Sequence, residues 1–270
     1  MLSKTQILTV MKKPFIFRAL QPLQFICLSI LLTSANAKEK TYDTITFPSL
    51  DGLQMTADLY SPFPDTSKPF IILCHQAGWS RGEYREIAPK LNTLGFNCIA
   101  IDQRSGGSVN NTKNETAAKA KASKKGQDYI DAEQDIIATI QYVKQDLAKG
   151  KIILWGSSYS SALVLRIAGE QPESVDAALA FAPGEYFKSQ GKSANWIARS
   201  AKKIKCPTFI TSAKSEAENW ASIHKAIPTS TKEKFIPSTK GNHGSRALWK
   251  KFADNTQYWE ATNKFLAQFL

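Results

Sequence analysis

The sequence predicts an α/β protein with a mainly parallel central sheet, an antiparallel hairpin at its start and helices on both faces of the sheet. Three observations lead to this prediction. Short apolar segments with strand character alternate along the chain with longer segments of helical spacing. The apolar segments end at turn residues, as expected of strands that are buried on both faces. The pair Asp51-Gly52 separates the first two strand-like segments and favours a tight hairpin.

The elements follow in a regular order along the chain. The hairpin is expected from Tyr42–Phe47 and Leu53–Tyr60. Further strands are expected at Phe70–Cys74, Asn97–Ile101, Lys151–Trp155, Val175–Phe181 and Pro207–Thr211, with a weaker one at Glu233–Ile236. Helices are expected at Tyr84–Leu94, Asp128–Leu147, Tyr159–Gly169 and Arg246–Leu270, the last of them in one piece or two. A strand-helix-strand order of this kind places the ligand site beyond the carboxyl ends of the strands, so the residues just after each strand are the candidates for function.

The first 37 residues have the features of a signal peptide. Lys12, Lys13 and Arg18 precede the ten-residue apolar segment 23–32, and Ala35-Asn36-Ala37 provides a small-x-small cleavage site. The apolar segment is too short to span a bilayer. The sequence therefore predicts an exported protein, periplasmic or secreted, that is cleaved near Ala37 and keeps no stable membrane anchor.

The remaining residues, 38–270, are expected to form one α/β domain. This part carries 31 Lys and Arg against 23 Asp and Glu, a net charge of +8. Much of the excess is local to residues 113–125, which lie within an expected inserted polar loop at 108–127. No aromatic residues interleave these lysines, so a nucleic-acid partner is not expected. Asp102 and Arg104, which follow the strand at 97–101, are expected to have structural roles.

The cysteines of this domain do not indicate a metal site. Cys74, Cys98 and Cys206 lie in or beside apolar strand-like segments, which is typical of buried free thiols. The sequence contains no CxxC motif and no Cys/His spacing suited to zinc, so no metal is expected.

A candidate nucleophile lies between the strand at 151–155 and the helix at 159–169. The sequence Gly156-Ser157-Ser158-Tyr159-Ser160 requires a sharp turn, which small residues on either side of the apex allow to close. Ser158 is at the apex, and the N–H groups at the start of the helix lie beside it. The last position of this G-x-S-x-S pattern is Ser160 where glycine is usual.

A carboxylate and a histidine follow two later strands. Glu216 and Glu218 come after the strand at 207–211, and His243 lies in Gly241-Asn242-His243-Gly244 after the weaker strand. A serine hydroxyl needs a base to take its proton, and the base needs a carboxylate to fix its tautomer. The order serine, acid, histidine therefore predicts a catalytic triad.

The strand at 70–74 is followed by His75-Gln76-Ala77-Gly78, which fits one half of an oxyanion hole formed by backbone N–H groups. The second donor is expected to be the N–H of Tyr159, directly after the candidate nucleophile.

These residues resemble the α/β-hydrolase superfamily and, within it, the dienelactone-hydrolase-like or small secreted serine esterase branch. The resemblance is carried by five segments in the family's order: 75–78, Asp102-Gln103-Arg104-Ser105-Gly106-Gly107, 156–160, Cys206-Pro207-Thr208-Phe209-Ile210 and 241–244. It implies an α/β-hydrolase fold for residues 38–270.

The same resemblance assigns site residues. It implies that Ser158 is the nucleophile and His243 the base. The family's acid lies about nine residues after the proline that opens its strand, which is the position of Glu216; Glu218 and Glu185 are the alternatives. The oxyanion donor is expected from Ala77 or Gln76, and Ala77 is favoured.

The sequence thus predicts a serine hydrolase that acts on a carboxylic ester and uses no cofactor or metal. A peptidase or thioesterase would use the same triad, and a non-catalytic binding protein on the same fold is a further alternative. Residues 182–205 are expected to form a short cap, which suits a small or extended ester substrate. Trp79, Tyr186 and Trp196 are the residues expected to line the pocket.

Overall fold

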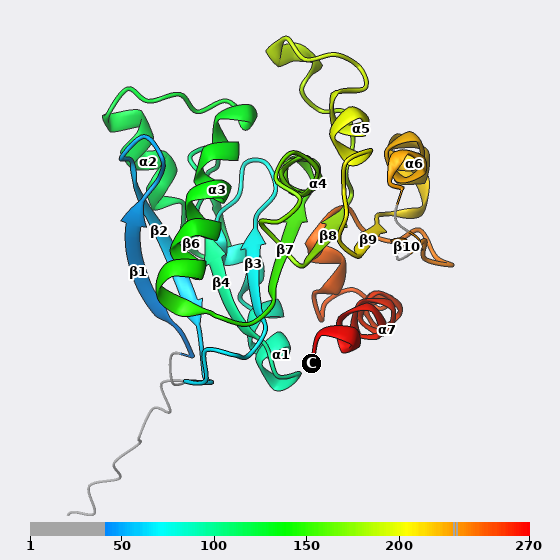
Figure 1. Ribbon diagram of the computed structural model, residues 1–270, viewed down its shortest axis with the longest axis horizontal. Helices are drawn as coiled ribbons and strands as arrows, with labels where there is room; N and C mark the ends of the chain where they lie inside the picture. Colours follow the sequence, from blue (N-terminus) through cyan, green and yellow to red (C-terminus); the bar gives the residue numbers. More distant parts are fainter. Residues whose placement is uncertain (1–40, 229, 231) are drawn as a thin grey trace, which may run out of the picture. The chain divides into compact units, whose positions relative to one another are not determined.

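The computed structural model describes residues 41–228, 230 and 232–270, so the expected signal peptide at 1–37 lies outside the described residues. An eight-stranded sheet runs through the domain in the order β1-β2-β4-β3-β7-β8-β9-β10 (Figure 1). Its strands are β1 (Asp43–Pro48), β2 (Gln54–Tyr60), β3 (Phe70–Cys74), β4 (Asn97–Ile101), β7 (Ile152–Ser157), β8 (Ala177–Phe181), β9 (Thr208–Thr211) and β10 (Lys232–Phe235).

The sheet is antiparallel only at its first edge. β1 pairs with β2 and β2 with β4 in antiparallel register, and the Asp51-Gly52 turn closes the hairpin as predicted. From β4 to β10 all neighbouring strands are parallel. The carboxyl ends of these parallel strands therefore meet at one edge, where the loops that follow β3, β7, β9 and β10 lie close together.

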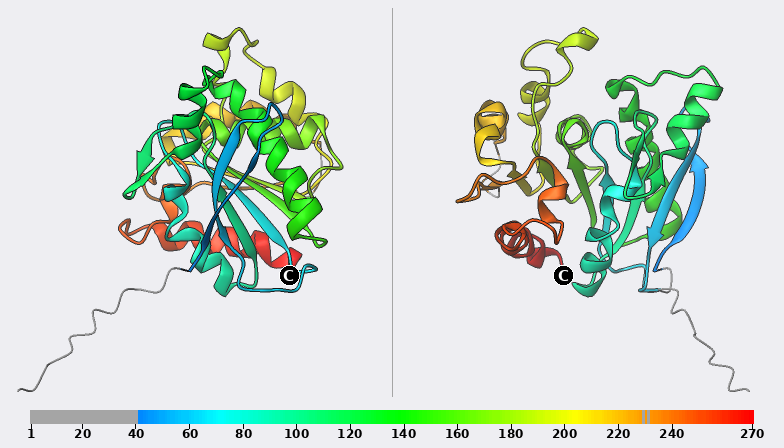
Figure 2. Two further views of the ribbon diagram at one scale, coloured as in Figure 1. Left: turned by 90° about the vertical axis from the view of Figure 1, so that its left-hand side faces the viewer. Right: turned by 180° about the vertical axis from the view of Figure 1, so that it is seen from behind.

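Helices cover both faces of the sheet, and each layer has its own apolar core (Figures 1 and 2). One face is covered by α3 (Glu133–Tyr142), α4 (Tyr159–Glu170), α5 (Trp196–Ala201) and α6 (Ala217–Ala226). The other is covered by α1 (Ile87–Thr93) and α7 (Asn255–Leu266). Alternate side chains of β3 enter the two cores: Ile72 packs on the first face and Ile71 on the second. This double burial explains the continuous apolar run of β3.

Several helices are shorter than the sequence pattern predicted. The segment expected as one helix at 84–94 is a 3₁₀ turn at Arg81–Tyr84 followed by α1. Pro89 lies in the first turn of α1, where its missing N–H has no helical partner to lose. The segment 128–147 is divided into a 3₁₀ turn at Tyr129–Ala132, α3, and a π-helical turn at Val143–Leu147.

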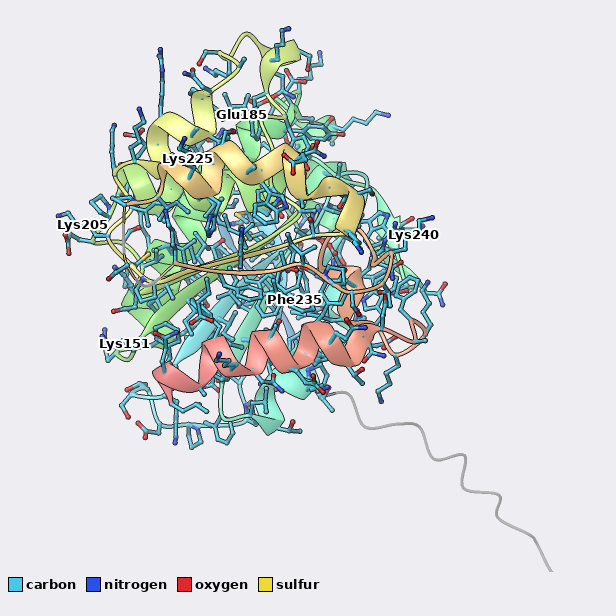
Figure 3. All side chains as sticks on the ribbon, turned by 90° about the vertical axis from the view of Figure 1, so that its right-hand side faces the viewer. Lys151, Glu185, Lys205, Lys225, Phe235 and Lys240 are labelled. Atoms are coloured by element: carbon cyan, nitrogen blue, oxygen red, sulfur yellow. The ribbon has the colours of Figure 1, made fainter. Side chains whose placement is uncertain are left out.

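The closing segment is also divided, into 3₁₀ turns at Ser245–Leu248 and Ala267–Phe269 with α7 between them. In Figure 3, Phe235 at the end of β10 points toward α7. Its ring meets Tyr258 of α7 edge to face, with the ring centroids 5.3 Å apart. The contact packs α7 against the last strand of the sheet.

Residues 108–127, expected as a polar loop, contain regular structure. They form a small hairpin of β5 (Ser108–Val109) and β6 (Thr112–Lys113) and the helix α2 (Glu115–Ala122). The Asn114 side chain accepts a hydrogen bond from the N–H of Ala117 and so caps α2. Small alanines and long lysines gave the segment little apolar periodicity, which is why the helix was not predicted.

Two buried arginines, Arg81 and Arg104, form ion pairs with aspartates of other segments. The Arg104 guanidinium pairs with Asp135 at 2.8 Å and with Asp51 at 2.9 Å. Asp102 pairs with Arg81. Both sets have side chains that are almost fully buried, except for the partly exposed Asp51. These contacts support the structural roles expected for Asp102 and Arg104.

The three described cysteines are buried and free. Burial raises the pKa of the thiols of Cys74 and Cys98, and it raises the pKa of Cys206 to about 11. None of the helices in the described part of the chain is long and apolar enough to cross a membrane.

Candidate active site

Ser158 is held at a sharp turn between β7 and α4. Its backbone has φ 57° and ψ −123°, a conformation that L-residues rarely adopt. Gly156 lies so close to α4 that an added Cβ would come within 2.5 Å of the Ser160 carbonyl oxygen. The glycine therefore allows the turn to close, as the sequence pattern predicted, and Ser158 is projected at the carboxyl edge of the sheet.

Ser160 has a hydrogen-bonding role at the position where glycine is usual. Its hydroxyl donates to the carbonyl of His75 at the end of β3 and accepts a 2.7 Å hydrogen bond from Gln103 Nε2. The Ser160 side chain is completely buried. The fifth residue of the motif thus connects the first turn of α4 to two neighbouring loops.

His243 lies between Ser158 and Glu216. Its Nε2 is 2.8 Å from Ser158 Oγ, and its Nδ1 is 2.6 Å from Glu216 Oε1. The other carboxylate oxygen of Glu216 accepts a 3.2 Å hydrogen bond from the N–H of Ala213, which fixes the orientation of the carboxylate. The structure therefore brings together the three residues for which the sequence predicted triad roles.

The two alternative carboxylates lie elsewhere. Glu218 is exposed in the first turn of α6. Glu185, labelled in Figure 3, accepts hydrogen bonds of 2.8 and 2.9 Å from the N–H groups of Ile197 and Ala198 at the start of α5. Glu185 therefore caps the N-terminus of α5, which lies in the segment 182–205.

His75 fixes the segment that was expected to supply one oxyanion donor. His75 Nε2 accepts a 3.1 Å hydrogen bond from the N–H of Gln103, so its proton lies on Nδ1 and is donated to the Gln76 carbonyl at 2.8 Å. Burial lowers the pKa of His75 to about 4, which keeps the ring neutral. A trans peptide directs its N–H opposite to its carbonyl. With the Gln76 carbonyl fixed on His75, the N–H of Ala77 is directed the other way.

The backbone N–H groups of Gln76, Ala77 and Tyr159 differ in whether they already have a hydrogen-bond acceptor. The N–H of Gln76 donates to the Glu83 carboxylate at 2.8 Å and is not free for a substrate. Within the described residues, the N–H groups of Ala77 and Tyr159 have no hydrogen-bond acceptor. The geometry therefore favours Ala77 over Gln76 as the partner of Tyr159.

The three residues expected to line the pocket have different surroundings. The Tyr186 hydroxyl donates to the Ala182 carbonyl at 2.7 Å. Burial raises the pKa of Tyr186 to about 12, and a hydrogen bond with Ser158 acts in the opposite direction, so this residue lies at the site.

The two tryptophans are engaged in ring packing. Trp79 stacks on Trp249 with 5.3 Å between ring centroids and remains half-exposed. Trp196 packs against Phe187 at 5.1 Å and under the Arg166 guanidinium at 4.1 Å. These contacts give Trp196 a packing role between α4 and α5.

A buried network behind the site was missed by the sequence analysis. Glu83 is completely buried and accepts hydrogen bonds from Ser157 Oγ at 2.7 Å and from the N–H of Gln76. Ser157 Oγ in turn accepts from the N–H of Ser245 at 2.9 Å. Only Gly244 carried a sequence signal: it has φ +68°, and a Cβ there would meet Ser157 Oγ at 2.5 Å. Glycine is therefore required at position 244, where the loop 241–244 approaches the turn between β7 and α4.

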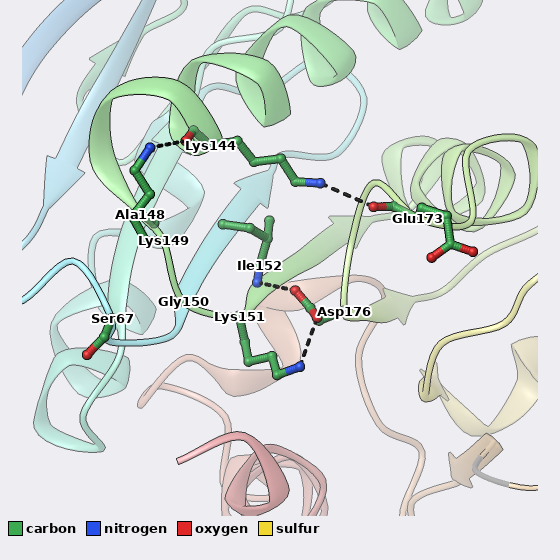
Figure 4. Close-up of a pocket in the computed structure, with 9 residues that line it drawn as sticks. All are labelled: Ser67, Lys144, Ala148, Lys149, Gly150, Lys151, Ile152, Glu173 and Asp176. Carbon is green, nitrogen blue, oxygen red and sulfur yellow. Dashed lines mark hydrogen bonds and ion pairs between the residues drawn. The ribbon is translucent and has the colours of Figure 1, made fainter.

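A hollow lies at the opposite end of the parallel strands, around the start of β7 (Figure 4). Its lysines are engaged locally: Lys151 pairs with Asp176 at 3.1 Å, and Lys144 donates to the Glu173 carbonyl at 3.2 Å. It contains none of the residues described above. In the described ranges, no group of three or more His, Cys, Asp and Glu side chains is arranged to hold a metal ion.

Comparisons with known proteins support the fold and the family. No curated protein matches the sequence. Among solved structures, an esterase of Pyrococcus furiosus is similar at 17% identity and a TM-score of 0.63, over 84% of this chain and 92% of that chain. A dienelactone hydrolase of Anabaena variabilis is similar at 15% identity and a TM-score of 0.64, over 86% of this chain and 100% of that chain.

The dipeptidyl peptidase 4 of Porphyromonas gingivalis is similar at 15% identity and a TM-score of 0.60, over 85% of this chain and only 35% of that chain. At such identities these likenesses show the shared fold, which is the α/β-hydrolase fold predicted from the sequence. The sequence model of the family described as serine aminopeptidase, S33, matches residues 65–213, more than half of the chain. The chain therefore belongs to this family of α/β-hydrolases.

Proposed function

We propose that this protein is an exported serine hydrolase that cleaves carboxylic esters, with Ser158 as nucleophile, His243 as general base and Glu216 as the acid. The observation that carries the proposal is the continuous hydrogen-bonded chain Ser158 Oγ–His243 Nε2 at 2.8 Å and His243 Nδ1–Glu216 Oε1 at 2.6 Å. A binding protein without catalytic activity has no need of this arrangement.

The reaction follows from the hydrogen bonds. An ionised Glu216 only accepts, so the proton of neutral His243 is on Nδ1 and its Nε2 is free to take the proton of Ser158. The Ser158 oxygen attacks the ester carbonyl, and His243 then protonates the leaving alcohol. The N–H groups of Ala77 and Tyr159 stabilise the negative oxygen of the tetrahedral intermediate. Water then attacks the acyl-enzyme carbonyl while His243 takes its proton, and His243 returns the proton to Ser158 Oγ as the bond to the acyl group breaks and the carboxylic acid leaves.

A peptidase function is the second candidate, because the family carries the description serine aminopeptidase. This chain covers 92% and 100% of the neighbours described as an esterase and a dienelactone hydrolase, but only 35% of the one described as a peptidase. We favour the ester for that reason. A p-nitrophenyl ester and an aminoacyl p-nitroanilide, assayed side by side, distinguish the two substrate classes.

The test of the nucleophile uses a fluorophosphonate probe, which labels activated serines. The mature wild-type protein should be labelled and should hydrolyse p-nitrophenyl butyrate. Ser158→Ala should not be labelled and should lose activity by about 10⁴-fold or more. Ser193→Ala, in the exposed part of the cap, is the matched control and should behave as wild type. Retained turnover by Ser158→Ala would refute the assignment.

A further inference from the structure

Glu83 is a buried carboxylate that the reaction described above does not use. It lies in the 3₁₀ turn Arg81–Tyr84 that follows β3, and no part of its side chain is exposed. Its Oε2 accepts a hydrogen bond from the N–H of Gln76 at 2.8 Å, and its Oε1 accepts from Ser157 Oγ at 2.7 Å. A carboxylate in the interior is costly unless it is hydrogen-bonded in this way.

The donor of each hydrogen bond in this chain is fixed by chemistry. The N–H of Ser245 can only donate, so Ser157 Oγ is the acceptor of their 2.9 Å contact. The hydroxyl proton of Ser157 is then directed to Glu83 Oε1. Hydrogen bonds therefore run from the loop that carries His243, through the residue before Ser158, to the Glu83 carboxylate.

The segments joined by Glu83 are those that supply the reacting groups. Gln76 directly precedes Ala77, Ser157 directly precedes Ser158, and Ser245 is two residues beyond His243. We propose that Glu83 is a positioning residue of the hydrolase site. Its carboxylate fixes the relative positions of three segments: the oxyanion segment (75–78), the nucleophile turn (156–160) and the histidine loop (241–246). The inference rests on the proposed hydrolase function and adds to it a residue that touches neither substrate nor triad.

The hydrogen bonds require the ionised form of Glu83. Both carboxylate oxygens accept, so a proton on Oε2 would face the N–H of Gln76 and a proton on Oε1 would face the hydroxyl proton of Ser157. Burial raises the pKa of Glu83 to about 7, while the hydrogen bonds from Ser157 and Gln76 and the charges of His243 and Arg246 act to lower it.

The groups around Glu83 are few. His243 and Arg246 face it from the histidine loop, and Tyr84 from its own turn. The side chains that meet it from the ends of β3 and β7, Gln76 and Ser157, do not titrate. A change in activity near neutral pH that is present in wild type and absent from Glu83→Gln is therefore assigned to this carboxylate.

The experiment compares Glu83→Gln with wild type in p-nitrophenyl butyrate hydrolysis from pH 5 to 9. The amide keeps the shape of the side chain but places an NH₂ against one of the two donors. Misplacement of the reacting groups should lower kcat by about 10–100-fold and leave KM within about threefold. Glu86→Gln is the matched control, because Glu86 is exposed in the same segment and its carboxylate accepts a hydrogen bond from the N–H of Lys250, away from the site.

The pH profile is the readout that a merely structural role would not change. In wild type, kcat/KM should fall below neutral pH more steeply than in Glu83→Gln, because Glu83 takes up a proton there. Glu83→Gln lacks this carboxyl group and should therefore show the shallower fall. Unchanged kcat and an unchanged profile in a folded Glu83→Gln variant would overturn the positioning role.

A second variant decides the case in which Glu83→Gln does not fold. Ser157→Ala keeps the carboxylate but removes its connection to the nucleophile turn and the histidine loop, and it should show a similar loss of kcat. Normal kcat in Ser157→Ala would overturn the proposal. A wild-type protein that the fluorophosphonate does not label would overturn the hydrolase function and the positioning role together, whereas a labelled wild type with unaffected variants overturns the positioning role alone.

Discussion

The Ser160 hydroxyl donates a hydrogen bond to the main-chain carbonyl of His75, and so ties the first turn of α4 to the end of β3. The same hydroxyl accepts from Gln103 Nε2, whose amide also donates to the Tyr159 hydroxyl at 2.9 Å. These groups are all buried. The serine at the last position of the G-x-S-x-S motif is thus part of the structure that supports both proposed oxyanion donors.

Replacing Ser160 by the usual glycine should destabilise the protein. Ser160→Gly leaves the His75 carbonyl and the Gln103 amide each short of a partner and places glycine in a helix, so we expect a loss of about 2–3 kcal/mol in the free energy of unfolding. Urea denaturation measures the change. Ser160→Ala separates the causes: it lacks the hydroxyl but keeps the helix propensity, and should account for most of the loss. A neutral Ser160→Ala would contradict the role of the hydroxyl.

Glu216→Gln tests the acid of the proposed triad. The amide would present an NH₂ or a weaker acceptor to His243 Nδ1, which disfavours the required tautomer, so kcat should fall by about 10³–10⁴-fold at neutral pH. Circular dichroism should show a fold like that of wild type. Glu218→Gln is the control from the same segment, since Glu218 is exposed in the first turn of α6 and solvated surface charges contribute little.

Glu185→Gln completes this comparison. It weakens the cap of α5, so it should lower stability slightly and leave kcat close to wild type. If Glu185→Gln or Glu218→Gln were the inactive variant instead, the wrong carboxylate would have been chosen. If all three were active, His243 would work without a carboxylate partner.

Glu83 should make stability depend on pH. Its pKa is raised from 4.5 to about 7 in the folded protein, so the folded state favours the protonated form. That stabilisation is complete below pH 4.5 and is lost as the pH rises through 7, by up to about 3 kcal/mol. Glu83→Gln has no such group. Its stability relative to wild type should therefore improve between pH 5 and pH 8, as measured by chemical denaturation at both values. An equal difference at the two pH values would show that Glu83 does not titrate in this range.

The exported form should begin at or near Lys38, because Ala35-Asn36-Ala37 supplies a cleavage site for a signal peptidase. Intact-mass measurement of protein from the exported fraction checks this. A mass that retains residues 1–37 would favour an anchored form over a cleaved one.

The sequence was most informative about features that a short stretch of residues determines. β3 and β4 were predicted with their observed bounds, because strands buried on both faces leave an uninterrupted apolar signal. Ser158, Glu216 and His243 could be selected because each follows a strand of a parallel sheet, and such loops meet at one edge. Their spacing along the chain required no knowledge of side-chain contacts.

The residues that were not predicted depend on contacts between distant segments. Nothing in the sequence around Glu83 distinguishes a buried carboxylate from a solvated one, because its side-chain partner Ser157 lies 74 residues away. The choice between Gln76 and Ala77 required the direction of one peptide group, which the His75 ring sets. The helix α2 was missed because its stability comes from the Asn114 cap and from packing on β2 rather than from an apolar stripe.

The reactivity of the three buried thiols reports on the unfolding of this protein. Alkylating reagents and oxidants attack the thiolate, and burial raises the pKa of Cys74, Cys98 and Cys206 while it shields their sulfur atoms from solvent. Cys74 and Cys98 lie on the central strands β3 and β4, which are exposed only when the sheet itself opens. Their rate of alkylation therefore follows the population of globally opened molecules, without any label added to the chain. For the same reason, the folded protein can persist in an oxidising compartment with its thiols unmodified, although it has no disulfide among them.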